Sequence, residues 1–130
     1  MKAVDTNILV RWLTRDDPVQ TPIADRVMAT PVDVPHTVFL ELAWVLGGRT
    51  YRFDRQRLSI ALRAVLDTQT VHIAEEDAVR WAVERFAHGG DIADMLHLTA
   101  LHGCRAFVSF DHGLHERAGP HAPVPVERPA

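Results

Sequence analysis

A chain of 130 residues suits one domain, because two domains would each be too small to bury a good core. Apolar residues make up 47% of the chain and charged residues 24%, the balance of a globular protein, and the single cysteine excludes an internal disulfide. The formal net charge of −3 argues against a protein that grips nucleic acid through overall positive charge.

The first half of the chain predicts two strands, each followed by two helices. The strands are expected at residues 2–4, where an apolar run ends at Asp5, and at residues 32–34. Asn7 is the expected N-cap of the first helix, which runs to about Leu13. The further helices are expected at residues 20–28, 37–46 and 55–66.

The second half of the chain continues this alternation. A strand is expected at residues 70–73, followed by a helix that begins at the acidic residues 75–77 and ends at Gly89 and Gly90. The remaining expected elements are a helix at 92–102, a strand at 106–108 and an edge strand at 124–126. The proline-rich end beyond about residue 119 is expected to pack loosely. Together these elements predict one α/β domain over residues 1–130, with a mainly parallel sheet and helices on both faces.

Four acidic residues stand out by their positions. Asp5 and Asp111 follow predicted strands, and ligands of parallel α/β sheets bind beyond the carboxyl ends of the strands. Glu41 is the only charged residue of the run 38–46, and Asp94 is the only acidic residue of its own apolar run. A helix that is apolar on every side is expected to be buried. A carboxylate inside it costs roughly several kcal/mol unless it is paired, protonated or bound to metal.

Each acid also has an ordinary structural explanation. Glu41 could pair with a buried arginine, and Asp94 could cap its helix, although Asp91 directly precedes the apolar run and is the better cap. Asp5 and Asp111 could be turn residues. If all four converge in one pocket they repel one another, and a hard divalent cation such as Mg²⁺ or Mn²⁺ would offset that repulsion through oxygen ligands.

Four runs of the sequence resemble, in order, the motifs of the PIN-domain ribonucleases, and in particular those of the VapC-type toxins of bacterial toxin–antitoxin pairs. The runs are DTNILVR from Asp5, ELAWVL from Glu41, DIADMLHL from Asp91 and FVSFD from Phe107. They cover nearly the whole chain. Any one run is a weak signal, whereas four in this order within 130 residues are specific.

This resemblance implies a PIN fold, with three layers, α/β/α, and a central, mainly parallel sheet of four to five strands. It also implies an endoribonuclease that cleaves RNA phosphodiesters with Mg²⁺ or Mn²⁺ as cofactor. By position, Asp5, Glu41 and Asp94 match the core acidic triad of the family. Asp111 matches its less constant fourth acid, so these four are the expected catalytic and metal-binding residues.

The resemblance also carries expectations for the residues around these acids. Thr6, Asn7 and Ser109 match positions that support the acids by hydrogen bonds. Ser109 stands where the family usually has threonine, and it keeps the hydroxyl. Asp91 and His97 are expected at the rim of the site or in packing contacts, and neither is assigned as a ligand.

A basic stretch interleaved with aromatic residues occupies residues 49–57. It offers candidate contacts to RNA or to a partner protein at Arg49, Arg52 and Arg55. A solvated loop and helix face explains the same stretch equally well.

The resemblance implies a cognate antitoxin and a homodimer that forms a heterotetramer or a larger assembly with it. Apolar residues on the early helices fit such partners: Trp12, Leu13, Val19 and Ile23. The N-terminus lacks the apolar run of a signal peptide, and no stretch approaches the length of a membrane span. A cytoplasmic protein without membrane contact is therefore expected.

Other classes of protein fit these residues less well. A phosphotransfer receiver domain needs a lysine late in the chain, whereas Lys2 is the only lysine, and an aspartyl phosphatase needs an acid where Asn7 stands. A zinc site is disfavoured because His97 and His102 do not share a helical face. Two alternatives stay open. One is a PIN-type RNA-processing or decay nuclease without an antitoxin, and the other is a non-catalytic module that binds RNA or a partner.

Overall fold

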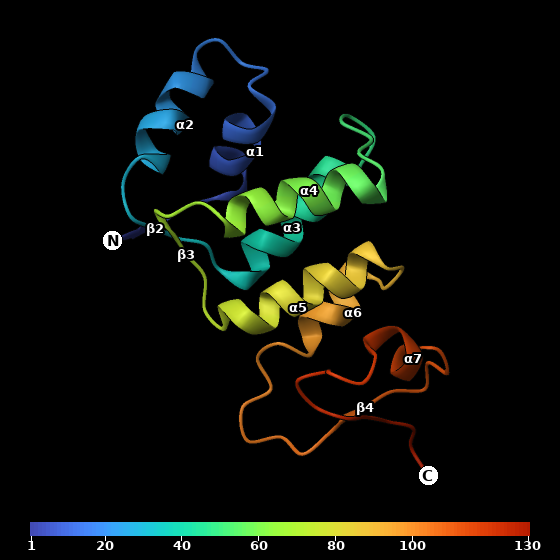
Figure 1. Ribbon diagram of the computed structural model, residues 1–130. Coiled ribbons are helices and arrows are strands. Elements are labelled where there is room, and N and C mark those ends of the chain that lie inside the picture. The colour runs from blue at the N-terminus through green and yellow to red at the C-terminus, as the bar shows by residue number, and fades with distance from the viewer. The chain divides into compact units, whose positions relative to one another are not determined.

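The computed structural model describes residues 1–130, and its contacts divide the chain into two compact units, Met1–Glu76 and Asp77–Ala130. The first unit carries a three-stranded sheet and four helices, and the second carries three helices and a pair of strands (Figure 1). Each unit has its own parallel strands and its own buried side chains.

The first unit alternates strands with pairs of helices. Its elements are β1 (Lys2–Ala3), α1 (Thr6–Thr14), α2 (Gln20–Met28), β2 (Val32–Asp33), α3 (His36–Gly47), α4 (Arg55–Leu66) and β3 (Val71–His72). The strands pair in parallel in the order β1-β2-β3, so that Lys2, Val32 and Val71 lie side by side. Parallel neighbours need a long crossover between them, and the helix pairs α1–α2 and α3–α4 supply it.

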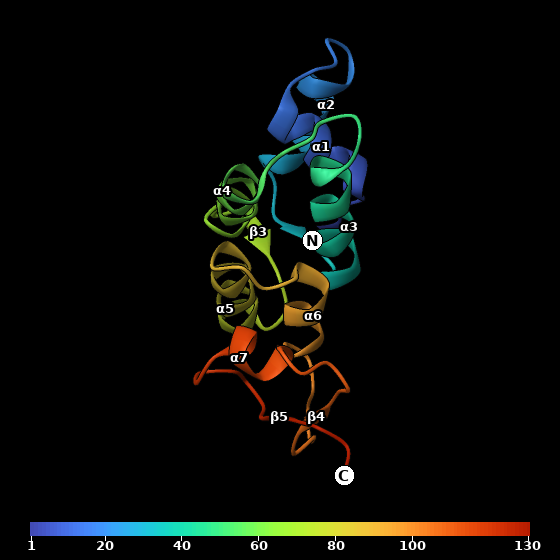
Figure 2. The same ribbon diagram turned by 90° about the vertical axis from the view of Figure 1, so that its right-hand side faces the viewer.

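The core of the first unit lies against its central strand, β2. Val32 and Val34 are fully buried there. Helix α1 packs on α2 and on α3, and α3 packs on α4 (Figures 1 and 2). These helices contribute fully buried side chains that include Leu9, Phe39 and Leu62. The strands of this sheet are therefore held in place by a well-packed core.

Helix α3 is buried on one face only, which corrects the expectation that its apolar run is buried all round. Its buried residues follow helical spacing: Phe39, Leu42, Ala43 and Leu46. The other face is open, because Glu41 is exposed and Trp44 is 60% exposed. The apolar composition of the run therefore does not predict the environment of Glu41.

The second unit joins three helices to a pair of short strands. Its elements are α5 (Glu76–Ala87), α6 (Ile92–His97), β4 (Phe107–Val108), α7 (Leu114–Ala118) and β5 (Val126–Glu127). β4 and β5 pair in parallel, with Phe107 beside Val126. Gly89 has a φ of 114°, the positive-φ backbone that favours glycine, and it follows α5 as the sequence predicts.

Two helices of the second unit differ from the sequence prediction. Helix α6 ends at His97 rather than at residue 102. The Thr99 hydroxyl donates to the Leu96 carbonyl at 2.7 Å, a local bond that competes with a continued helix. Helix α7 is missing from the prediction, because its five residues are too few for apolar periodicity to reveal.

The prediction of an α/β fold with parallel strands is confirmed, although the strands form a sheet of three and a separate pair in place of the expected single sheet of four to five strands. All five strands pair in parallel, three in the sheet of the first unit and two in the second, and seven helices accompany them. The edge strand predicted at residues 124–126 is present as β5, Val126–Glu127. No helix combines the length and the apolar character that crossing a membrane requires.

We predict that Leu62→Ala in α4 destabilises the first unit by roughly 2–5 kcal/mol, because Leu62 is fully buried and its truncation leaves a cavity. Ile60→Ala in the same helix is the matched control. Ile60 is 58% exposed, and its truncation should change the free energy of unfolding by less than about 0.5 kcal/mol. Urea unfolding measures both variants, and equal destabilisation would contradict the packing of α4.

Candidate metal centre

Asp5 directly follows β1 and caps the helix that comes next. Its backbone is extended (φ −86°, ψ 164°), and its side chain accepts a hydrogen bond from the Thr6 amide at 2.6 Å. Helix α1 therefore begins at Thr6, and Asp5 is its N-cap, where Asn7 was expected. The bond that starts the helix also fixes the Asp5 carboxylate at the carboxyl end of β1.

Thr6 links this helix start to Glu41 of α3. Thr6 is only 4% exposed, and its hydroxyl donates a hydrogen bond to Oε1 of Glu41. Asp5 and Glu41 thus share one neighbour, Thr6, which bonds to the first through its amide and to the second through its hydroxyl. Asn7 is exposed and makes no hydrogen bond to either acid.

A cavity of about 450 Å³ opens beside Asp5. Lys2 and Arg26 line it together with Asp5, and apolar side chains of α1 and α2 line much of the rest. Lys2 is the only lysine of the chain. Two basic side chains and the Asp5 carboxylate therefore share one cavity, and positive charge there could bind a phosphate group.

In the second unit, Asp91 caps α6 and places Asp94 in its first turn. The Asp91 carboxylate accepts a hydrogen bond from the Asp94 amide at 3.0 Å, as the sequence predicts. Burial raises the pKa of the Asp94 carboxyl, and the negative charges of Asp91 and Asp111 raise it further. The charges of His97 and Arg117 lower this pKa and so offset part of the rise. Asp94 is therefore close enough to other acids to feel their repulsion.

Asp111 lies after β4, and hydrogen bonds to its amide and its carboxylate hold it in place. Its amide donates to the Ser109 hydroxyl at 3.0 Å, so Ser109 supports this acid through the backbone. Its carboxylate accepts from the Gly113 amide at 2.9 Å and from the Arg117 guanidinium at 2.5 Å. Both donors lower the pKa of the Asp111 carboxyl, and the Gly113 bond is the larger cause.

The expected acids thus form a pair in each unit, Asp5 with Glu41 and Asp94 with Asp111. Neither unit by itself gathers three His, Cys, Asp or Glu side chains in an arrangement that could hold an ion. The chemistry of the donors nonetheless fits Mg²⁺ or Mn²⁺, because each pair offers carboxylate oxygens and a supporting hydroxyl.

The four acids differ in whether they form an ion pair with a basic side chain. Asp5, Glu41 and Asp94 form no ion pair with an arginine or a lysine, whereas Asp111 pairs with Arg117. Neutral donors, the amide and hydroxyl of one threonine, hold the first two acids. The negative charge of three of the four acids is therefore left without a basic partner, which is what a bound cation would use.

His97 lies on α6 near these acids without joining them. Its ring stacks on Phe107 of β4, with 6.2 Å between the ring centroids and 18° between the planes. A packed helix histidine is the role that the sequence favours for this residue.

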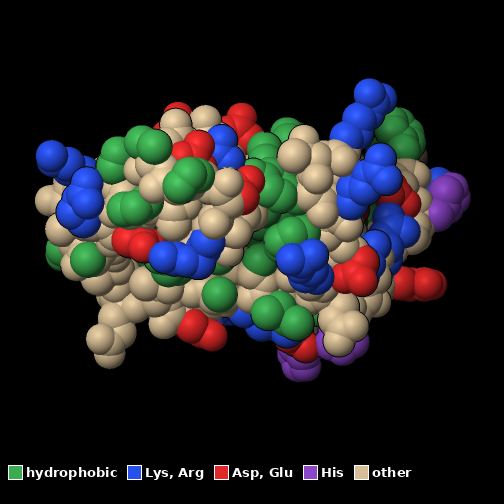
Figure 3. Space-filling view, turned by 90° about the horizontal axis from the view of Figure 1, so that it is seen from above, with side chains coloured by type: hydrophobic (Ala, Val, Ile, Leu, Met, Phe, Trp, Pro, Cys, Tyr) green, Lys and Arg blue, Asp and Glu red, His purple; other side chains and the backbone are tan.

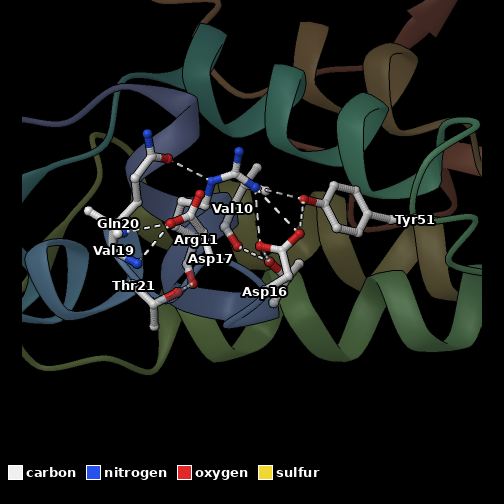
Figure 4. Close-up of polar contacts among 9 residues, drawn as sticks. Val10, Arg11, Asp16, Asp17, Val19, Gln20, Thr21 and Tyr51 are labelled. Atoms are coloured by element: carbon white, nitrogen blue, oxygen red, sulfur yellow. Dashed lines mark hydrogen bonds and ion pairs between the residues drawn. The ribbon is translucent and has the colours of Figure 1, made fainter.

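Further along α1, Arg11 ties three segments of the first unit together (Figure 4). Its guanidinium donates to Gln20 at 2.8 Å, to Asp16 at 3.1 Å and to the Tyr51 hydroxyl at 3.1 Å. The Tyr51 hydroxyl in turn donates to Asp16 at 2.7 Å. This bond, followed by one from the Thr14 hydroxyl, lowers the pKa of the Asp16 carboxyl to about 2. The network anchors the loop between α3 and α4 to α1.

The anchored loop carries the basic stretch that the sequence singles out. Tyr51 and Phe53 meet edge to face with 6.4 Å between their centroids, and the Arg57 guanidinium lies 4.0 Å from the Phe53 ring. Both aromatic side chains are engaged within the protein, which disfavours their stacking on a base. The arginines expected to contact RNA or a partner are exposed: Arg49, Arg52 and Arg55.

Several large apolar side chains lie exposed on the helices of the first unit, and hydrophobic side chains appear among charged ones on the surface (Figure 3). Val19, at the start of α2, is 70% exposed, and Ile23 is 45% exposed. The other two apolar residues expected at a partner surface, Trp12 and Leu13, are half-buried. Apolar surface on α2 and α3 is therefore available to a partner.

Sequence reasoning misses three basic residues that lie beside the acids: Lys2, Arg26 and Arg117. The one usable signal is that the only lysine stands three positions before Asp5. Arginines in polar segments look like solvated surface, so nothing in the sequence distinguishes Arg117 from its neighbours.

Comparison with known protein families gives a match over almost the entire chain. A family model described as PIN domain matches residues 2–120, a range that includes all four expected acids and residues of both units. No curated protein matches the chain significantly.

We predict that Tyr51→Phe raises the pKa of the Asp16 carboxyl from about 2 towards 3.8, because it removes the hydrogen bond that contributes most to the shift. NMR titration of the side-chain carboxyl carbons measures this pKa. Asp25, whose lowered pKa comes from Arg15, is the internal control and should titrate as in the wild type.

The same substitution should change how stability depends on pH. A carboxyl whose pKa is lowered on folding stabilises the protein above its unfolded pKa, and this contribution is lost as the pH falls through the folded pKa. The wild type therefore loses the contribution of Asp16 between pH 3.8 and about 2, and the variant has less of it to lose. An unchanged Asp16 titration would contradict the network drawn in Figure 4.

Proposed function

Because the chain belongs to the PIN domain family, whose members are generally nucleases that use divalent metal ions, we propose that it is a Mg²⁺- or Mn²⁺-dependent endoribonuclease. The observation that supports this most directly is the set of acids without a basic partner: Asp5, Glu41 and Asp94. Acids held in place by neutral donors keep the charge that binds a hard cation.

We propose that Asp5, Glu41, Asp94 and Asp111 together are the catalytic and metal-binding residues. The support is the order of their motifs along the chain and the family match, which spans residues of both units. On this proposal residues 1–130 act as a single PIN domain. The carboxyl groups position the cation and do not attack the substrate.

When bound, the ion would supply an activated water for in-line attack on the phosphodiester and would stabilise the charge on the leaving 3′ oxygen. Asp5 and Asp94 are the proposed direct ligands. Glu41 receives the Thr6 hydroxyl on Oε1, so its second oxygen can bind the cation or orient the attacking water. Ser109 holds the backbone of Asp111, which completes the site directly or through water.

RNA is the proposed substrate, and basic side chains outside the acid pairs would hold its phosphates. Lys2 and Arg26 line the cavity beside Asp5 and can bind a phosphate next to the proposed cleavage site. Further exposed arginines that could hold phosphates are Arg49 and Arg52 of the anchored loop and Arg55 at the start of α4.

We further propose that the protein is a VapC-type toxin that acts in the cytoplasm and is inhibited by a cognate antitoxin. Homodimer formation and a heterotetramer or larger assembly with the antitoxin belong to the same proposal. The motif resemblance supports it, and the exposed apolar residues Val19, Ile23 and Trp44 offer surface for such contacts.

Two other functions compete with this one. An RNA-processing or decay nuclease would cleave RNA in the same way, but no small antitoxin gene would lie immediately upstream of its own. A non-catalytic module would keep its biological activity after removal of the metal.

We predict that Asp5→Asn and Asp94→Asn each lower metal-dependent RNA cleavage by more than about 100-fold, because each removes a proposed ligand charge. Both variants should fold, and Asp94→Asn should be at least as stable as the wild type, since it relieves repulsion from Asp91 and Asp111. Asp77→Asn, which changes an exposed acid of α5, is the matched control and should cleave like the wild type. Full cleavage by the Asp94→Asn protein, purified free of other nucleases, would defeat the assignment.

We predict that the wild-type protein cleaves a mixed RNA pool in the presence of Mg²⁺ or Mn²⁺, and that a chelator abolishes cleavage. Mapping of the cut ends by sequencing then gives the target preference. The Asp5→Asn protein, treated in parallel, controls for contaminating nuclease. Cleavage that persists at the same rate in chelator would exclude the proposed mechanism.

A further inference from the structure

Resting on the proposed function, we propose that Arg117 is a positioning residue that occupies Asp111 until a divalent cation replaces it, and so sets the affinity of the site for the cation. Asp111 is the one acid of the four that pairs with a basic side chain. Its Oδ1 accepts the Gly113 amide at 2.9 Å, and its Oδ2 accepts Nη2 of Arg117 at 2.5 Å. The guanidinium takes the carboxylate oxygen that the backbone amide does not use.

This ion pair is exposed enough to be broken. The side chains of Arg117 and Asp111 keep 36% and 45% of their accessible surface. Ion pairs with this exposure contribute little to stability, because water screens both charges. A divalent cation carries twice the charge of a guanidinium and prefers carboxylate oxygens as ligands. The cation can therefore displace Arg117 from Asp111. Because the ion pair must be broken first, it weakens the binding of the cation.

Two neighbours hold Arg117 where it can reach Asp111. Nε of Arg85 donates to the backbone carbonyl of Arg117 at 2.7 Å, which fixes the last turn of α7. Gly113 provides space, because a Cβ at this position would lie 2.2 Å from Nη1 of Arg117. The φ of Gly113 is −88°, which other residues adopt freely, so the glycine serves clearance and not backbone conformation.

The influence of Arg117 extends to the neighbouring acid. Its positive charge opposes the rise in the pKa of Asp94 that burial, Asp91 and Asp111 cause. One guanidinium thus compensates part of the repulsion within the second unit's acid pair before a cation is bound.

The test is Mn²⁺ binding, measured by calorimetry on the full-length protein. Arg117→Met removes the guanidinium, and Gly113→Ala displaces it without a change in net charge. Both variants should bind Mn²⁺ about fivefold more tightly than the wild type, the most that an exposed ion pair usually contributes. Arg117→Lys, which keeps a positive charge, should return the affinity towards that of the wild type.

Two controls separate this role from a general effect of charge. Arg105→Met removes the same charge from an exposed position before β4 and should bind Mn²⁺ like the wild type. In an Asp111→Asn background, Arg117→Met should change the affinity by less than about twofold, because the oxygen for which both compete is gone.

Equal or weaker Mn²⁺ binding by Arg117→Met and Gly113→Ala overturns the role of Arg117 and leaves the proposed nuclease intact. If the wild type binds no Mn²⁺, the proposed function fails, and this inference fails with it. Circular dichroism checks that each variant is folded, and Gly113→Ala decides the question where Arg117→Met does not fold.

Discussion

Repulsion between carboxylates is the constraint on which the candidate site depends. Burial raises the pKa of the Asp94 carboxyl, and repulsion from Asp91 and Asp111 raises it further. An arginine offsets part of the charge at Asp111, whereas neutral donors hold Asp5 and Glu41. Neutral donors orient a carboxylate without removing its charge. A site built in this way keeps most of its negative charge for a cation.

The scaffold of the first unit fixes its acid pair through the start of one helix. Parallel strands place Asp5 at a carboxyl end, and the need to cap α1 holds its carboxylate in a defined position. Buried Thr6 then extends the order to Glu41, which has no partner on its own exposed face of α3 other than this hydroxyl. The hydrogen bonds that start α1 therefore also position the two acids of the candidate site.

Apolar spacing predicted most of the fold, because it reports which face of a helix or strand is buried. It located α4 to the residue, whereas proline signals bounded α2 and the alternation of strands with helices indicated the α/β class. It failed where local hydrogen bonds matter, as at the end of α6, where the Thr99 hydroxyl bonds to the Leu96 carbonyl, and at Asp5, which caps α1 in place of Asn7. Such bonds depend on atoms only a few residues apart and leave no periodic trace.

The burial argument that singled out Glu41 in the sequence is wrong, although the proposal that Glu41 belongs to the site does not depend on it. Glu41 was singled out as a charge in an apolar helix, yet that helix exposes the face on which Glu41 lies. Its position in the motif, and not burial, is what marks it. Nothing in the sequence indicated a role for Arg117. An arginine six residues after Asp111 resembles any solvated surface residue, and only the fold shows that the two side chains meet. The sequence therefore reveals the candidate acids more readily than the basic side chain that pairs with one of them.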